Sequence, residues 1–154
     1  MTPAVAALVD SHAHLDMADF DADRDLVLQR AHEAGVRTVL CPAELADASS
    51  LNTILGLRGR YPDRIVAAAG VHPHRAKDFT DAHLGAIRSL AESGAIKAVG
   101  EIGLDFYYDL SPADAQRRAL REQALLAREL GLPLIVHTRQ AGAEAADIIA
   151  QAGF

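Results

Sequence analysis

The sequence Val9-Asp10-Ser11-His12-Ala13-His14-Leu15-Asp16 follows a short apolar run, Val5–Val9, near the N-terminus. The run predicts a buried strand, which places His12 and His14 at the strand's exit. Side chains at i and i+2 of an extended chain point to the same side, so both imidazoles can reach one point. Imidazole is a common ligand of divalent transition metals. The pair indicates either a metal site or two unrelated surface histidines.

Composition predicts a single domain, residues 1–154, in which helices cover a parallel sheet. Half of the 154 residues are hydrophobic and few are aromatic, as is typical of that class. The formal net charge of −6 gives little non-specific attraction to phosphates, so nucleic acid would have to be held locally, by metals or a few arginines. The sequence shows no secretion signal and no apolar run near the roughly 20 residues of a membrane span. The single cysteine, Cys41, excludes an internal disulfide, and we expect a cytoplasmic protein.

Strand and helix patterns alternate along the whole chain, without a linker. Apolar runs predict five strands, and residues at helical spacing, with capping residues and glycine stops, predict five helices between and after them. The expected strands are Val5–Val9, Val36–Cys41, Ile65–Val71, Ile96–Gly100 and Leu134–Val136, and the expected helices are Asp21–Ala34, Ser49–Arg60, Asp81–Gly94, Ser111–Gly131 and Ala143–Ala152. Five consecutive βα units predict a parallel sheet with helical crossovers.

Polar residues follow four of these strands at the points where the strands end. An ionisable group there costs free energy unless it is paired or bound to a metal. In a parallel barrel the carboxyl ends of all strands share one mouth, where active sites are built. The residues concerned are His12 and His14, His72 and His74, Glu101 and Asp105, and His137 and Arg139.

Four motifs together resemble the TatD family of metal-dependent hydrolases, which are amidohydrolase-like (β/α)8 barrels. The motifs are Asp10-Ser11-His12-Ala13-His14-Leu15-Asp16, Gly70-Val71-His72-Pro73-His74, Gly100-Glu101-Ile102-Gly103-Leu104-Asp105-Phe106 and Val136-His137-Thr138-Arg139. The resemblance covers the whole chain and implies a TIM-barrel-type fold, here truncated to about five βα units. It also implies a deoxyribonuclease, a 3′-5′ exonuclease, that cleaves phosphodiester bonds with two divalent metal ions.

The resemblance implies a role for each of four residues. His12 and His14 match ligands of the first metal, Glu101 matches the catalytic carboxylate that bridges both metals, and His137 matches a ligand of the second. A bridging carboxylate keeps two cations together against their repulsion, and the charge and position of Glu101 agree with that role. Mixed histidine and carboxylate ligands suit zinc or manganese, while magnesium prefers more oxygen ligands.

Two further residues are candidates for substrate binding. His72 contacts a substrate phosphate, as the resemblance suggests, or bonds a loop carbonyl. Arg139 pairs with a phosphate through its planar guanidinium, or forms a salt bridge with a nearby acid. We expect His74 to be a loop residue.

Asp105 and Asp16 each have two interpretations. Either carboxylate orients a metal-binding histidine or merely caps a turn. The tyrosines that follow Asp105, Tyr107 and Tyr108, stack on a base or pack as part of a lid.

The chain, at 154 residues, is shorter than members of the family it resembles, since a complete (β/α)8 barrel typically needs about 250 residues. No counterpart is present for the family's histidine after strand six or its aspartate after strand eight. We therefore expect a fragment, or one half of an assembly, with an exposed apolar sheet face that favours self-association. Alternative functions are hydrolysis of another ester, such as an aminoacyl-tRNA, and a catalytically incomplete interaction module.

Overall fold

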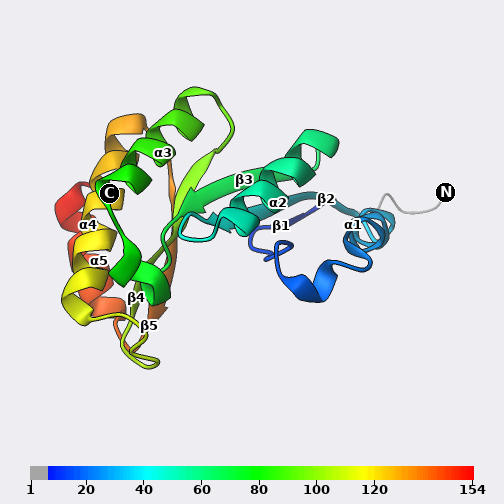
Figure 1. The fold of residues 1–154 in the computed structure, drawn as a ribbon. Helices are drawn as coiled ribbons and strands as arrows, with labels where there is room; N and C mark the ends of the chain where they lie inside the picture. Colours follow the sequence, from blue (N-terminus) through cyan, green and yellow to red (C-terminus); the bar gives the residue numbers. More distant parts are fainter. Residues whose placement is uncertain (1–6) are drawn as a thin grey trace.

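A computed structural model describes residues 7–154, and its centre is a five-stranded parallel sheet in the order β1-β2-β3-β4-β5 (Figure 1). Every strand pairs with its neighbours in sequence, because each connecting helix crosses back over the same face. The strands are β1 (Leu8–Asp10), β2 (Val36–Glu44), β3 (Ile65–Gly70), β4 (Ala98–Asp105) and β5 (Leu134–Arg139). The expected α/β fold of five βα units is therefore confirmed, while Val5 and Ala6 of the first expected strand lie outside the described residues.

The helices lie along the sheet in sequence order, α1 and α2 beside the N-terminal strands and α4 and α5 beside β4 and β5 (Figure 1). Asp47 caps α2 by accepting a hydrogen bond from the Ser49 N–H, and α4 ends at Gly131 in the left-handed conformation that glycine favours. The helices are α1 (Arg24–Glu33), α2 (Ala48–Arg60), α3 (Asp81–Glu92), α4 (Ala113–Leu130) and α5 (Gly142–Ala152), with short 3-10 helices η1 (Ala18–Phe20) and η2 (Pro73–Asp78).

Strand β4 is longer than the expected Ile96–Gly100, so Glu101 and Asp105 lie within the strand and not after it. Pairing with β5 extends it, because Gly103 lies opposite His137 and Asp105 opposite Arg139. Gly103 has a φ of 152°, and a side chain there would overlap the backbone of His137. The close approach of the two strands therefore depends on glycine and brings the ends of β4 and β5 together.

The core lies between the sheet and its helices. Its largest fully buried aliphatic side chains are Ile54, Leu57, Ile65, Ile87, Ile96, Ile102, Leu104 and Leu120. The two edge strands are much less covered, since Val9 of β1 is 67% exposed and Val136 of β5 is 38% exposed. Self-association through such a surface stays a prediction. None of the helices within residues 7–154 has the length and apolar character needed to cross a bilayer.

Two buried glutamines on α4 hydrogen-bond the backbone at the ends of two strands. Gln123 accepts a hydrogen bond from the Val71 N–H at 2.8 Å and donates one to the Val71 carbonyl at 3.2 Å. Gln116, two helical turns earlier, accepts from the Asp105 N–H at 2.7 Å and donates to the Asp105 carbonyl at 3.1 Å. Both amides satisfy buried polar groups, and they hold the backbone beside the motifs of β3 and β4.

Candidate metal centre

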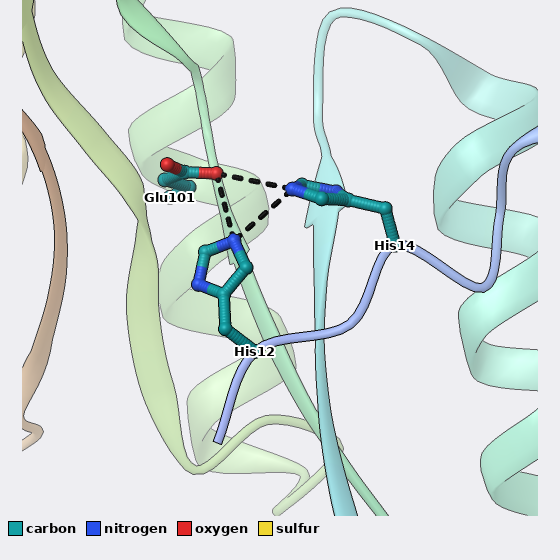
Figure 2. A group of neighbouring side chains, drawn as sticks. All are labelled: His12, His14 and Glu101. Carbon is teal, nitrogen blue, oxygen red and sulfur yellow. Dashed lines mark hydrogen bonds and ion pairs between the residues drawn. The ribbon is translucent and has the colours of Figure 1, made fainter. Parts of the chain in front are cut away.

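The Glu101 carboxylate lies at the centre of the histidine cluster, and one of its oxygens faces the N-terminal motif (Figure 2). Glu101 Oε2 is 3.2 Å from His12 Nε2 and 3.4 Å from His14 Nε2. The two imidazole nitrogens are themselves 3.0 Å apart. The structure thus brings together the three residues expected at the first metal position.

The other oxygen of Glu101 faces imidazoles from β5 and from the segment after β3. Glu101 Oε1 is 3.2 Å from His137 Nδ1 and 3.9 Å from His72 Nε2. Each oxygen of this one carboxylate therefore faces a different set of histidines. That is the arrangement a ligand bridging two cations requires.

The donor set fits divalent metal ions. Neutral imidazole offers a lone pair on one ring nitrogen and carboxylate oxygen offers only lone pairs, so a group of such atoms is stable with a proton or a cation among them. Burial opposes ionisation of Glu101, but the hydrogen bond with His14 and the nearby charges of His72, His12 and His137 lower its pKa to about 2. The hydrogen bond to Glu101 in turn raises the pKa of His14. Both shifts show that this carboxylate favours positive charge beside it.

His72 differs from the other imidazoles because its tautomer is set by the backbone. Its Nδ1 accepts a hydrogen bond from the His74 N–H at 3.1 Å. Burial lowers the pKa of His72 to about 4, so the ring is neutral at pH 7 and carries its hydrogen on Nε2. An Nε2–H can donate a hydrogen bond but cannot bind a metal. In this tautomer His72 is a hydrogen-bond donor on the side that faces Glu101.

Asp105 and His74 form the buried side of the cluster. Asp105 is completely buried, and its Oδ2 lies 2.7 Å from His74 Nε2 and 3.0 Å from His137 Nε2. Its Oδ1 accepts the N–H groups of Tyr107 and Tyr108, each at 3.0 Å. Burial opposes the charge, but these four donors hold the pKa of Asp105 well below its usual range. His74 was expected to be a loop residue, whereas it lies in η2 and its ring packs on those of His72 and His137.

Asp16, the other acid with two interpretations, lies behind His14. Its Oδ2 accepts a hydrogen bond from the Ser50 hydroxyl, while its buried Oδ1 has no hydrogen-bond partner among residues 7–154 and lies 3.9 Å from His14 Nδ1. The carboxylate therefore faces the histidine but does not bond it in this structure.

Arg139 lies at the end of β5, where its guanidinium stacks on two tyrosine rings. The distances to the ring centroids are 4.1 Å for Tyr107 and 4.5 Å for Tyr108. Among residues 7–154, the structure records no salt bridge between Arg139 and an acid. The guanidinium and the half-exposed rings together offer one positive charge and two flat surfaces at the edge of the cluster.

A cavity of about 450 Å³ opens beside the cluster. Two of its charged lining residues were not predicted from the sequence: Arg75, which follows the His72–His74 motif directly, and Glu44 at the end of β2. Glu44 accepts the N–H groups of Ala46 and His72, although burial raises its pKa. The position of Arg75 beside the motif was a signal for it, and Glu44 follows the predicted strand Val36–Cys41 by three residues, which was the same signal that marked the other site residues. The lining residues are His14, Asp16, Met17, Pro42, Ala43, Glu44, Gly70, His72, His74, Arg75, Glu101 and His137.

Comparison with known proteins agrees with this geometry. The family model described as TatD related DNase matches residues 9–154. YabD of Bacillus subtilis, named an uncharacterized metal-dependent hydrolase, is 35% identical over 95% of this chain and 56% of its own length. TatD of Erwinia tasmaniensis, named a 3′-5′ ssDNA/RNA exonuclease, is 38% identical over 87% of this chain and 51% of its own.

A solved structure shows the same fold. The crystal structure of YjjV, a TatD homologue from Escherichia coli K12, superposes with a TM-score of 0.83 at 33% identity and covers 94% of this chain and 56% of that one. The chain thus spans about half the length of the relatives it matches. By the extent of the sequence match and by this fold, the chain belongs to the TatD family.

Proposed function

We propose that this chain provides the N-terminal part of a metal-dependent phosphodiesterase, a 3′-5′ exonuclease that acts on DNA. One observation carries the proposal: the two oxygens of Glu101 face two separate sets of imidazoles, with His12 and His14 on one side and His137 on the other. The name of the Erwinia relative supports a nucleic-acid substrate. The buried state of the single cysteine, Cys41, is compatible with action in the cytoplasm.

Two divalent cations, when bound, would polarise a phosphoryl oxygen and lower the pKa of an attacking water. His12, His14 and Glu101 would hold the first, and Glu101 and His137 would hold the second. Three protein ligands are a usual number for a catalytic zinc ion, whereas two leave an ion weakly held. We therefore expect at most one tightly bound metal per chain, on the side of His12 and His14.

The remaining side chains would bind the substrate. His72 presents an Nε2–H toward Glu101 and the cavity, where it can donate to a phosphate oxygen. Arg139 supplies a positive charge, and the tyrosines under it present flat faces on which a base can stack. These contacts would position the phosphodiester beside Glu101.

Metal analysis and a nuclease assay test the proposal together. Purified protein should bind close to one equivalent of Zn²⁺ or Mn²⁺ tightly, and it should release nucleotides from the 3′ end of single-stranded DNA only with metal present. Activity should be far below that of a complete TatD barrel. Protein that binds no divalent metal would contradict the proposal. Hydrolysis of an aminoacyl-tRNA ester without DNA cleavage would support the alternative substrate, and metal binding without either activity would support an interaction module.

A further inference from the structure

Asp105 uses its two oxygens for two different purposes. Oδ1 accepts the N–H groups of Tyr107 and Tyr108, which closes the turn after β4. Oδ2 lies 2.7 Å from His74 Nε2 and 3.0 Å from His137 Nε2. Closing a turn would need only one oxygen, so the histidine contacts are a separate feature.

The contacts of Oδ2 are direct hydrogen bonds. His74, Asp105 and His137 also form a group that could hold a metal. However, two ligands about 2.0 Å from a tetrahedral ion lie roughly 3.3 Å apart, well above the 2.7 Å between Asp105 Oδ2 and His74 Nε2. A carboxylate that already accepts two backbone N–H groups is an acceptor only. Both imidazoles must therefore carry a hydrogen on Nε2.

A neutral imidazole with a hydrogen on Nε2 has its lone pair on Nδ1. For His137, that lone pair points at Glu101 Oε1, 3.2 Å away. Two acceptors that face each other at this distance repel, and a cation between them removes that repulsion. The other tautomer of His137 would place a hydrogen on Nδ1, which would donate to Glu101 and close the position.

The backbone of Asp105 is held as firmly as its side chain. Gln116 bonds both its N–H and its carbonyl, and the Gln116 amide also donates to the Ser111 carbonyl at 2.8 Å. Asp105 is completely buried and Gln116 is 1% exposed. The carboxylate therefore cannot follow a histidine that turns, and the histidines must adapt to it.

We propose that Asp105 is a positioning residue that fixes the tautomers of His74 and His137 and so keeps the His137 Nδ1 open for a cation shared with Glu101. The proposal rests on the proposed function in one respect, namely that His137 and Glu101 bind a metal. The tautomers themselves exist without metal, which allows the two ideas to be tested separately.

The first test measures the tautomers in the metal-free full chain by long-range ¹H–¹⁵N NMR of the imidazole nitrogens, at about pH 8.5, where an ordinary histidine is neutral. His74 and His137 should both show protonated Nε2 and unprotonated Nδ1. In Asp105→Asn, the amide offers a donor where the carboxylate offered an acceptor, so at least one of the two rings should switch to the Nδ1–H tautomer. The matched control is Asp147→Asn, at an exposed position of α5, which should leave the tautomers of both rings unchanged.

A second test measures Zn²⁺ binding by calorimetry in the same proteins. Asp105→Asn should weaken any binding that involves His137 by about 10–100-fold, the usual effect of losing a partner of a metal-bound histidine. Binding that depends on His12 and His14 should change much less, and a His137→Ala background should abolish the effect of Asp105→Asn.

The outcomes separate the two ideas. A parent chain with the Nδ1–H tautomer at His137 would overturn the role of Asp105, even if the Asn variant does not fold. So would a folded Asp105→Asn chain in which both rings keep Nε2–H. A parent chain with the expected tautomers that binds no Zn²⁺ would overturn the proposed function and leave the role of Asp105 standing.

Discussion

The two sides of Glu101 are built differently. On the N-terminal side, the His12 and His14 side chains are 37% and 43% exposed, and Asp16 lies 3.9 Å from His14 without bonding it. On the β5 side, the His137 side chain is 23% exposed and bonds the fully buried Asp105. One carboxylate thus joins an open half, His12 and His14, to a built half, His72, His74, Asp105 and His137.

This difference indicates how each half would acquire a ligand. The built half holds its imidazoles by hydrogen bonds that exist without any metal. A bound cation would therefore order these side chains little further. The open half has three donor atoms within 3.4 Å of one another and few other contacts, so a bound cation would itself order the side chains. On the built side the imidazoles are already held in place by hydrogen bonds. The open side offers a cation three protein ligands, counting Glu101, instead of two.

Glu101→Gln should have the largest effect, because it removes the charge that both halves share. The amide keeps the shape of the side chain, so folding should change little, while metal affinity should fall by more than the roughly 100-fold expected for a supporting residue. Metal content after dialysis and calorimetric titration measure this loss. Glu92→Gln on the exposed end of α3 is the control. If Glu101→Gln bound metal as tightly as the parent, the central role of Glu101 would be wrong.

Lowering the pH should change the stability of the metal-free protein in opposite directions through the two halves. Burial lowers the pKa of His72 from 6.5 to about 4, so the unfolded chain takes up this proton first and stability falls as the pH drops from about 6.5 toward 4. The pKa of His14 is raised, so its protonation stabilises the fold below pH 6.5 and that stabilisation is lost as the pH rises through the raised value.

Denaturant unfolding at several pH values, with a chelator present, measures this contrast. His72→Asn should flatten the acid side of the profile by about 1.4 kcal/mol per pH unit, the value for one proton. His14→Ala should leave the slope below pH 6.5 unchanged, and should remove the gain in stability that His14 gives as the pH falls from its raised pKa to about 6.5. Parallel profiles for the two variants would show that the halves do not differ in this way.

Without metal, and at a pH above the raised pKa of His14, the built half should matter for stability and the open half should not. Asp105→Ala leaves the part-buried N–H groups of Tyr107 and Tyr108 without their acceptor, which should lower the free energy of unfolding by about 1–3 kcal/mol. His14→Ala removes a side chain with 43% exposure, and its effect should stay within about 0.5 kcal/mol. Thermal or urea denaturation of both metal-free variants tests the ranking, which equal losses would contradict.

Arg139→Ala should have the smallest effect of these substitutions, and it should leave metal binding by both halves unchanged. The guanidinium lies on the tyrosines and not at Glu101, so its loss should weaken binding of single-stranded DNA several-fold, on the order of 1 kcal/mol, and leave metal content unchanged. Fluorescence anisotropy with a labelled oligonucleotide measures the affinity, and Arg121→Ala, at an exposed position of α4, is the control. Normal DNA affinity with depleted metal would instead make Arg139 a support of the metal centre.

The sequence was sufficient to predict which residues meet, because the carboxyl ends of parallel strands share one edge of a sheet. His12, Glu101 and His137 are far apart in the chain, yet they followed from strand order and motif position alone. The end of β4 was predicted at Gly100, five residues before the observed end at Asp105. The sequence there also contains Gly103. In the structure these glycines let β5 approach closely, a packing property that a strand's own sequence does not reveal.

The ring nitrogens could not be predicted in the same way. Which nitrogen of His72 or His137 carries the hydrogen depends on partners at the atomic scale, the His74 N–H and the Asp105 carboxylate. Gln116 and Gln123 were also overlooked. Their spacing of seven residues on an otherwise apolar helix face was the available signal, but only the fold shows that they reach the backbone beside β3 and β4.

Those two glutamines have a consequence for local opening of the protein. The N–H groups of Val71 and Asp105 are bonded by side chains of α4 and not by neighbouring strands. Their exchange with solvent deuterium should therefore follow the detachment of α4 and not the opening of the sheet. In a hydrogen-exchange experiment, these two amides would group with a helix that is distant from both in sequence, and would report how often the ends of β3 and β4 lose their support.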